Sequence, residues 1–463
     1  MFPESFRKRL RLQSYIDSGE LLSSLEQSSP VSIRINPGKW SAKPAVSSPV
    51  SWCETGYYLP YRPVYTLDPL FHSGCYYPQE ASGMFLKQAY IKATEGRVGL
   101  RILDLCGAPG GKSTLISEMA GRGSLLVANE VIRARAAILS ETITRWGAIN
   151  TIVTQNDPSV FARMPGYFDI VVADAPCSGE GMFRNPVAIK EWSQENAALC
   201  SERQKRILMD VWPALKENGI LIYSTCTFNP AENEENIKWL AGNHNIESLR
   251  LNINRFEGIA EITYKGIYGY GFHPGKIKGE GFFISVVRKH EKESNTERFP
   301  RLRPEYRPGK KDIDTMEKWT NYSGSNILKK GDELYGLPCS TNEYALLFSN
   351  LKVIRPGTRL AALRKDDYIP AHELALSQAL RKNVFPSAET GYNTALAYLG
   401  RDNFTVTVPE KGWNLLTYRD INLGFVKNIG NRLNNYYPVD WRIRMNHEGS
   451  SEASLIQWEE PAV

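Results

Sequence analysis

The sequence lacks the features that would place it in a membrane or outside the cell. No apolar run reaches the roughly 18 residues that a membrane-spanning helix needs. The basic start of the chain is not followed by an apolar block, so we expect no secretory signal. Cysteine is scarce: the seven residues are odd in number, widely spaced and without a Cys-x-x-Cys pair, which argues against disulfides and zinc. These absences predict a cytoplasmic protein with reduced thiols, no membrane contact and no metal.

A strong charge of one sign is also lacking. Lysine and arginine number 56 against 50 for aspartate and glutamate, a net charge of +6 over 463 residues. This small excess favours a nucleic-acid partner only mildly, because many basic enzymes bind none. With 42% hydrophobic and 23% charged residues the composition is globular, and the length suggests about three domains. Internal repeats and low-complexity tracts are not found.

The middle of the chain alternates between apolar strands and helical stretches. Buried strands are expected at 101–106, 124–130, 151–155, 168–174, 219–224 and 281–289. Helices are expected between them, at 112–120, 132–146, 196–215 and 232–240. Because such alternation joins parallel strands by crossovers, it predicts an α/β, doubly wound sheet.

The segments on either side of the sheet differ from it in composition and in hydrophobic pattern. An N-terminal segment with the alternating stretch SIRIN (32–36) precedes the sheet, and a charged, proline-rich linker follows it. The expected division is 1–70, 71–290 for the sheet domain, 291–312 for the linker, 313–390 for an intermediate module and 391–447 for a last module. The tail, GSSEASLIQWEEPAV (449–463), is expected to be frayed.

A glycine-rich turn follows the first strand and reads DLCGAPGGKS (104–113). A phosphate-binding P-loop would need glycine where Cys106 stands, and Pro109 interrupts a Gly-x-Gly-x-x-Gly spacing, so a nucleoside-triphosphate enzyme is disfavoured. Small residues leading into a helix start allow a close backbone approach and favour a carboxylate. We therefore predict a ligand-binding loop made by Cys106, Gly107, Ala108, Pro109, Gly110, Gly111 and Lys112.

Acidic residues stand at or just beyond the ends of four strands, at Asp104, Glu130, Asp157 and Asp174. Parallel strand ends meet in one crevice, where a carboxylate after the second strand binds ribose hydroxyls. Four carboxylates without a phosphate-binding cluster suit a ligand with an adenosine, a carboxylate and a cation, which is S-adenosylmethionine. The loop would hold its methionine end, Glu130 the ribose and Asp157 the adenine. The alternative, a turn that only closes a tight strand–helix connection, explains the loop but not the carboxylates.

Two cysteines lie just beyond neighbouring strands: Cys177 in DAPCSGEGMFR and Cys226 in STCTFNPAENEE. A free cysteine is usually a small buried hydrophobe, and we assign that role to Cys53, Cys75, Cys200 and Cys339. A methyl donor beside a thiol suits methylation of carbon 5 of a pyrimidine, because a thiolate adding at carbon 6 makes carbon 5 nucleophilic. Asp174 could hold the ring, while Lys112 and Arg184 are candidates for ionising the thiol.

These segments resemble signature motifs of the RNA (cytosine-5) methyltransferases, the Sun/Fmu-type family. The resemblance rests on the segments DLCGAPGGK, DAPCSGEGMFRNP and STCTFNPAENE, and the stretches GCYYPQEASGMF (74–85) and SIRIN fit the family's flanking motifs. The resemblance implies a Rossmann-like S-adenosylmethionine-dependent methyltransferase domain, with Cys226 as nucleophile and Cys177 assisting product release. It also implies that residues 106–112, Glu130, Asp157 and Asp174 bind S-adenosylmethionine. DNA cytosine-5 methyltransferases use the cysteine at the Cys177 position instead, and residue types alone do not separate the two. Gly107 replaces an alanine that is frequent in the family.

Basic and aromatic residues are interleaved near the C-terminus: Lys427, Arg432, Arg442 and Arg444 among Tyr436, Tyr437 and Trp441. Such mixing suits phosphate contacts and base stacking, but equally a small β-barrel core with solvated charges. The region resembles the C-terminal extension and PUA-like, β-rich RNA-binding module of the F-type bacterial ribosomal RNA cytosine methyltransferases. The resemblance implies an N-terminal α+β RNA-binding segment, a monomer, and 16S ribosomal RNA or the small ribosomal subunit as partner. A transfer RNA substrate, or an inactive RNA-binding ribosome-assembly factor, is the alternative.

Overall fold

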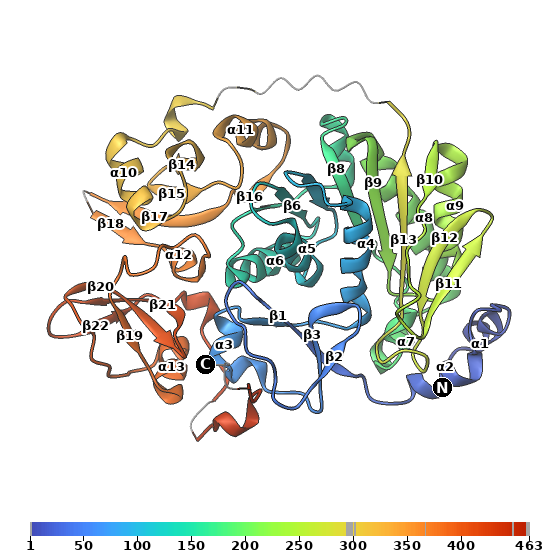
Figure 1. Ribbon diagram of the computed structural model, residues 1–463, viewed down its shortest axis with the longest axis horizontal. Coiled ribbons are helices and arrows are strands. Elements are labelled where there is room, and N and C mark those ends of the chain that lie inside the picture. Colours follow the sequence, from blue (N-terminus) through green and yellow to red (C-terminus); the bar gives the residue numbers. More distant parts are fainter. Residues whose placement is uncertain (1, 293–299, 301, 366, 447–448, 460–463) are drawn as a thin grey trace.

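The computed structural model describes residues 2–292, 300, 302–365, 367–446 and 449–459 (Figure 1). Its centre is a ten-stranded sheet in the order β11-β12-β13-β9-β8-β5-β6-β7-β16, with β10 beside β13. The five parallel strands are β5 (Arg101–Asp104), β6 (Leu125–Asn129), β7 (Thr151–Thr154), β8 (Phe168–Asp174) and β9 (Leu215–Thr225). β13 (Phe282–Lys289) runs antiparallel to β9. The predicted doubly wound α/β sheet is confirmed.

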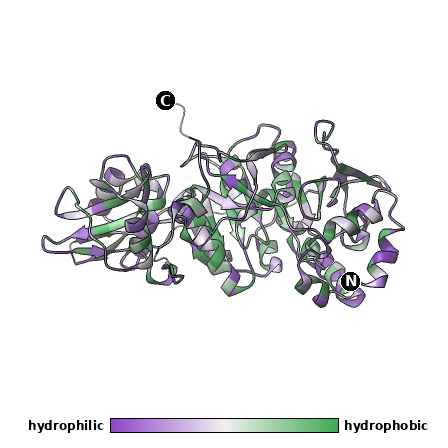
Figure 2. Cartoon of the chain, turned by 90° about the horizontal axis from the view of Figure 1, so that it is seen from below, coloured by the Kyte–Doolittle hydropathy of each residue, from purple (hydrophilic) through white to green (hydrophobic). Residues whose placement is uncertain are grey.

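Helices cover both faces of this sheet because successive strand residues are apolar on both sides. Ile102 packs in one cluster with side chains of α4 (Leu86–Thr94), α5 (Gly111–Ala120) and α6 (Arg133–Trp146). Its neighbour Leu103 packs in a second cluster with α8 (Gln194–Val211) and α9 (Glu234–Asn243). Hydropathy follows this layering: in Figure 2 the strands in the middle of the molecule are mostly green, and outer helices carry more purple.

Four strands of the sheet were not foreseen. β10 (Ile246–Ser248), β11 (Ile259–Tyr264) and β12 (Ile267–Phe272) extend the sheet beyond β13 with antiparallel pairs. At the other edge, β16 (Val353–Arg355) pairs with β7 although it lies far along the chain. Beside it, α11 (Thr341–Asn350) places Tyr344 and Leu347 in the same cluster as α8.

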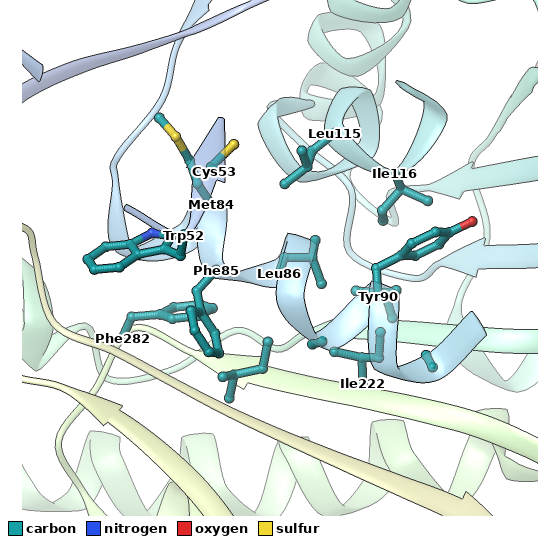
Figure 3. Close-up of a cluster of buried hydrophobic side chains, with 14 of the residues drawn as sticks. Trp52, Cys53, Met84, Phe85, Leu86, Tyr90, Leu115, Ile116, Ile222 and Phe282 are labelled. Atoms are coloured by element: carbon teal, nitrogen blue, oxygen red, sulfur yellow. The ribbon is translucent and has the colours of Figure 1, made fainter. Parts of the chain in front are cut away.

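The N-terminal segment is α+β, as predicted. Its helices are α1 (Glu4–Leu10), α2 (Ser18–Leu25) and α3 (Pro69–His72), and its sheet has the order β2-β3-β1-β4. The strands are β1 (Val31–Ile35), β2 (Ser48–Val50), β3 (Cys53–Leu59) and β4 (Tyr76–Pro78). This segment shares its core with the central sheet: Figure 3 shows Trp52, Met84 and Phe85 in one cluster with side chains of α4, α5, β9 and β13.

The C-terminal part holds two four-stranded sheets. The first joins β14 (Ile327–Lys330), β15 (Glu333–Gly336), β17 (Thr358–Arg364) and β18 (Asp367–Pro370). The second joins β19 (Ser387–Glu389), β20 (Gly412–Tyr418), β21 (Ile421–Asn428) and β22 (Leu433–Asn435). The remaining helices of the described chain are α7 (Pro186–Glu191), α10 (Lys310–Trp319), α12 (His372–Leu376) and α13 (Tyr392–Gly400). The predicted linker at 291–312 falls partly outside the described residues, at 293–299 and 301, and α10 begins within it.

The expected fraying of the tail is wrong for residues 449–459. Leu455 and Ile456 are buried against the N-terminal sheet and α13. The Trp458 ring lies edge-on to Trp40, with their centroids 5.4 Å apart. The packing of these two apolar residues and of Trp458 holds the segment against the rest of the protein. Residues 460–463 lie outside the described chain. Among the described helices, no stretch combines the length and the hydropathy required to cross a membrane.

Candidate active site

The glycine-rich turn forms a tight loop between β5 and α5. Gly110 has φ +119°, a backbone conformation that a residue with a side chain rarely adopts, and it directly precedes the helix. A Cβ on Gly107 would lie 2.7 Å from the Ser113 hydroxyl, so this position has less room than the alanine frequent in the resembling family would need. The loop therefore brings its backbone close to whatever lies beyond the end of β5.

A cavity of about 300 Å³ opens beside this loop. Eight residues predicted for the site line it: Cys106, Gly107, Ala108, Pro109, Gly111, Lys112, Asp174 and Cys226. They come from the ends of β5, β8 and β9, as the parallel topology requires. The remaining lining residues lie in three other segments and are Tyr77, Pro78, Gln79, Glu80, Gly83, Met182, Glu280, Gly281 and Phe282.

Lys112 and Asp174 form a half-buried ion pair at the cavity wall. The Lys112 Nζ donates to Asp174 Oδ2 at 2.8 Å, and the Ser224 hydroxyl donates to Asp174 Oδ1 at 2.7 Å. Burial alone would lower the pKa of Lys112, but the Asp174 carboxylate raises it above its usual value. Lys112 is therefore a permanent cation, which also lies near enough to Cys226 to interact electrostatically with its sulfur.

Asp104 is fully buried beneath the loop. Its Oδ2 accepts a hydrogen bond from the Ser113 hydroxyl at 2.6 Å, while its Oδ1 has no partner among the described residues. Burial, with a further contribution from Asp174, raises the pKa of Asp104 to about 7. The floor of the site thus holds a carboxyl group whose ionisation is costly.

The two cysteines beyond β8 and β9 meet. Cys177 Sγ lies 2.9 Å from Cys226 Sγ and accepts a hydrogen bond from the Cys226 amide at 3.3 Å. Both are free thiols. The hydrogen bond to Cys226 and burial hold the pKa of Cys177 well above its usual value. Cys177 therefore keeps its proton and can donate it to the Cys226 sulfur, which faces the cavity.

Other predicted residues lie outside this cavity. Glu130 is buried, accepts from the Ile132 amide at 3.0 Å and faces Arg135 at 3.6 Å. Asp157 caps a short helical turn through the Ser159 amide and hydroxyl. Gly110 and Cys177 are likewise not among the residues that line the cavity. The roles proposed for these residues, like those of the whole site, stay predictions.

Arg184 does not take the place suggested for it beside a thiol. Its guanidinium donates to the backbone oxygens of Ser24 (3.1 Å) and Gly279 (2.8 Å) and pairs with Glu280 at 3.2 Å. Arg184 therefore stabilises the segment before β13 through these contacts. The cation at the cavity wall is Lys112.

Sequence reasoning missed the contribution of the N-terminal segment and of β13. Glu80 accepts from the amides of Ser82 (2.9 Å), Gly83 (3.0 Å) and Glu280 (2.8 Å), which ties these two segments together at the cavity. Burial raises the pKa of Glu80. The one signal for this contribution in the sequence is the stretch GCYYPQEASGMF, which points to it only through its resemblance to a flanking motif. Among the described residues, no histidine, cysteine or carboxylate cluster has the arrangement of a metal site.

Comparisons with known proteins agree with this geometry. Residues 92–288 match the family described as 16S rRNA methyltransferase RsmB/F. Residues 2–81 match the N-terminal domain of 16S rRNA methyltransferase RsmF, and residues 385–443 match the methyltransferase RsmF PUA domain.

Relatives align along nearly the whole chain. The ribosomal RNA small subunit methyltransferase F of Citrobacter koseri is 31% identical over 94% of this chain and 96% of its own. That of Pectobacterium atrosepticum is 31% identical over 88% and 85%. A methyltransferase homolog protein from Pyrococcus horikoshii has a similar structure, with a TM-score of 0.52 and 25% identity over 62% of this chain and 95% of that chain. NSun6 from Pyrococcus horikoshii, solved with SFG, gives a TM-score of 0.52 at 20% identity, over 63% and 99%.

The fold and the site define an RNA methyltransferase of the S-adenosylmethionine-dependent, Rossmann-like class. The matches identify its N-terminal domain and its C-terminal PUA domain, which confirms the predicted fold class. Within that class the chain belongs to the ribosomal RNA small subunit methyltransferase F family.

Proposed function

We propose that this protein transfers a methyl group from S-adenosylmethionine to carbon 5 of a cytosine in the 16S RNA of the small ribosomal subunit, through a covalent bond between Cys226 and carbon 6. The observation that carries the proposal is the contact between two free thiols at the wall of a cavity built by the glycine-rich loop. Few other methyl-transfer chemistries would use a thiol there.

The cavity fits the donor because its lining is acidic. Lys112 is its one cation among the described lining residues and is already paired, whereas Glu80, Asp174 and Glu280 are acidic. Such a wall suits a cationic ligand and not a polyphosphate. Residues 106–112 would hold the donor's carboxylate end, and its ribose and adenine would extend beyond the cavity to Glu130 and Asp157. When bound, the donor supplies an electrophilic methyl group.

The chain's own groups supply the remaining chemistry. The Cys226 thiolate bonds to carbon 6 of the cytosine, which makes carbon 5 nucleophilic. Asp174, oriented by Lys112 and Ser224, accepts a hydrogen bond from the exocyclic amine of the cytosine and so holds the ring in place. After carbon 5 has gained the methyl group, a base removes the carbon 5 proton, the freed electron pair restores the double bond between carbons 5 and 6, and the bond between Cys226 and carbon 6 breaks with the sulfur leaving as a thiolate. Cys177, which keeps its proton, donates a hydrogen bond to the departing thiolate.

Trapping of the covalent adduct tests the assignment of the two thiols. With 16S RNA and S-adenosylmethionine, Cys177→Ala should accumulate a protein–RNA complex that survives denaturing electrophoresis, because product release is impaired. Cys226→Ala should form none. Adduct formation by Cys226→Ala would show that Cys177 is the nucleophile. Bisulfite sequencing of 16S RNA from cells lacking the protein would identify the cytosine.

The C-terminal sheets offer a surface for the RNA. A groove between the β17–β18 hairpin and β20–β21 is lined by aromatic and basic side chains that include Arg364, Trp413, Lys427 and Tyr436. Lys427 lies 5.0 Å over the Trp413 ring, and Trp413 and Tyr436 contact with centroids 4.4 Å apart. Cations beside aromatic rings suit phosphate contact and base stacking. In contrast, the predicted contact residue Tyr437 is buried.

Replacing the groove's central pair tests this surface. Trp413→Ala combined with Lys427→Ala should weaken binding of a 16S RNA fragment by about 10- to 100-fold, because base stacking alone contributes roughly 1–3 kcal/mol. Lys411→Ala, which changes an exposed lysine that does not line the groove, is the matched control. Equal affinities in a fluorescence-polarisation titration would exclude the groove as an RNA site.

A further inference from the structure

A buried carboxylate connects the two cysteine loops behind the cavity. Glu232 is fully buried in the turn between β9 and α9. Its Oε2 accepts from the Ser178 amide at 2.8 Å, and its Oε1 accepts from the Ser178 hydroxyl at 2.5 Å. Ser178 directly follows Cys177, so Glu232 holds the backbone of the first cysteine loop.

The same carboxylate also holds the second loop. Its Oε1 lies within 3.4 Å of the Thr227 hydroxyl and 3.3 Å of the Asn229 amide group, and Thr227 directly follows Cys226. The hydroxyls of Ser178 and Thr227 are themselves 3.0 Å apart. Gln204 of α8 donates to Oε2 at 3.2 Å. Burial raises the pKa of Glu232, and the hydrogen bonds from Ser178 and Gln204 oppose that rise by favouring the ionised carboxylate as an acceptor.

We propose that Glu232 is a positioning residue for product release: by binding Ser178 and Thr227 at once, it fixes the contact between the sulfur atoms of Cys177 and Cys226. The inference rests on the proposed function. The Cys226 sulfur leaves carbon 6 as a thiolate, and a hydrogen bond from the Cys177 thiol stabilises that leaving group only while the two loops keep their relative position. Formation of the adduct needs Cys226 and Lys112 and does not need this contact.

The inference predicts that the single-turnover rate and the steady-state turnover will respond differently to a substitution of Glu232. Glu232→Gln replaces one accepting oxygen by an amide NH2, which faces the same donors and breaks part of the link between the loops. We expect the single-turnover rate of methyl transfer to stay close to that of the wild-type protein. Steady-state turnover should fall by about 10²-fold, the scale of a misplacement of about 1 Å. The trapped protein–RNA complex should accumulate as in Cys177→Ala.

Two further variants keep the test decisive. Ser178→Ala removes the hydroxyl that joins Glu232 to Thr227 and introduces no buried amide. It should show the same difference between the two rates, and it remains available as a test if Glu232→Gln does not fold. Glu234→Gln is the matched control: Glu234 is also buried, and its Oε1 accepts a hydrogen bond from the Tyr15 hydroxyl at 2.7 Å. It should turn over and trap RNA as the wild-type protein does.

The outcomes separate this inference from the proposed function. A parallel loss of single-turnover and steady-state rates with a lower melting temperature would show that Glu232 is merely structural. Wild-type behaviour of both Glu232→Gln and Ser178→Ala would equally overturn the inference. If Cys177→Ala itself traps no RNA, the covalent mechanism of the proposed function is what fails.

Discussion

Replacing Asp104 by asparagine should stabilise the protein, and increasingly so as the pH rises. Asp104 lies beneath the glycine-rich loop with one oxygen bonded to Ser113 and the other without a partner among the described residues. Asparagine has nearly the same shape and retains an acceptor for the Ser113 hydroxyl. The substitution therefore removes a buried negative charge and little else.

The magnitude follows from the pKa of this carboxyl group. Folding raises the pKa of Asp104 from 3.8 to about 7, mainly through burial, so the folded protein binds its proton more tightly than the unfolded chain. The resulting stability is fully present below the unfolded pKa and is lost as the pH rises through about 7. The whole loss is about 4 kcal/mol, at about 1.4 kcal/mol for each pH unit, and about 2 kcal/mol of it falls between about pH 5.5 and about pH 8.5.

Equilibrium urea unfolding of both proteins at these two pH values measures the effect. The difference has to be taken between variants, because three histidines with lowered pKa values give the opposite trend. Burial lowers the pKa of His72 and His372 to about 3 and that of His273 to about 4. Their contribution to stability is lost as the pH falls below about 6.5, and it cancels in the comparison.

The control is Asp157→Asn. Hydrogen bonding by the Ser159 hydroxyl helps to lower the pKa of Asp157, so this substitution should bring no gain at high pH. A stability difference for Asp104→Asn that stays constant between the two pH values would refute the reasoning, as would a variant less stable than wild type at the higher pH.

Three shorter predictions concern the site and its support. Lys112→Met should lower the single-turnover rate by at least about 10²-fold with little change in circular dichroism, because it removes the cation near the nucleophile. Gly181→Ala places a Cβ within 2.5 and 2.8 Å of two backbone oxygens and should lower both activity and melting temperature, whereas Gly242→Ala, in open space, should not. Arg34→Met leaves Glu118 without its buried partner and should cost about 3–5 kcal/mol in urea unfolding.

The parallel core could be predicted because its strands are buried on both faces. Near-continuous apolar runs such as FDIVVAD mark β8, and the crossover helices follow at regular intervals. Strand β16 could not be predicted in this way. It has only three residues, and its pairing with β7 depends on how the preceding helix α11 packs against the sheet.

The same difference appears in the site. Residues at the ends of parallel strands must converge, so the meeting of Asp174, Cys177 and Cys226 was foreseeable from topology. The positions of Glu80 and Phe282 were not, because they depend on how the N-terminal segment and an antiparallel strand fold over the crevice. Arg184 was wrongly expected beside the thiols. It is close to Cys177 in the sequence, but its guanidinium contacts Ser24 and Glu280 instead.

The pairing of β16 with β7 has a consequence for how the protein is made. During vectorial synthesis the five parallel strands emerge from the ribosome long before residue 355, and until then β7 presents an unprotected edge to other chains. The nascent methyltransferase thus passes through a period, or window, in which association of the β7 edge with another chain competes with the pairing of β16 and β7. The demand for chaperones should reflect the length of that window, and a shortened version that ends before β16 should give a low yield.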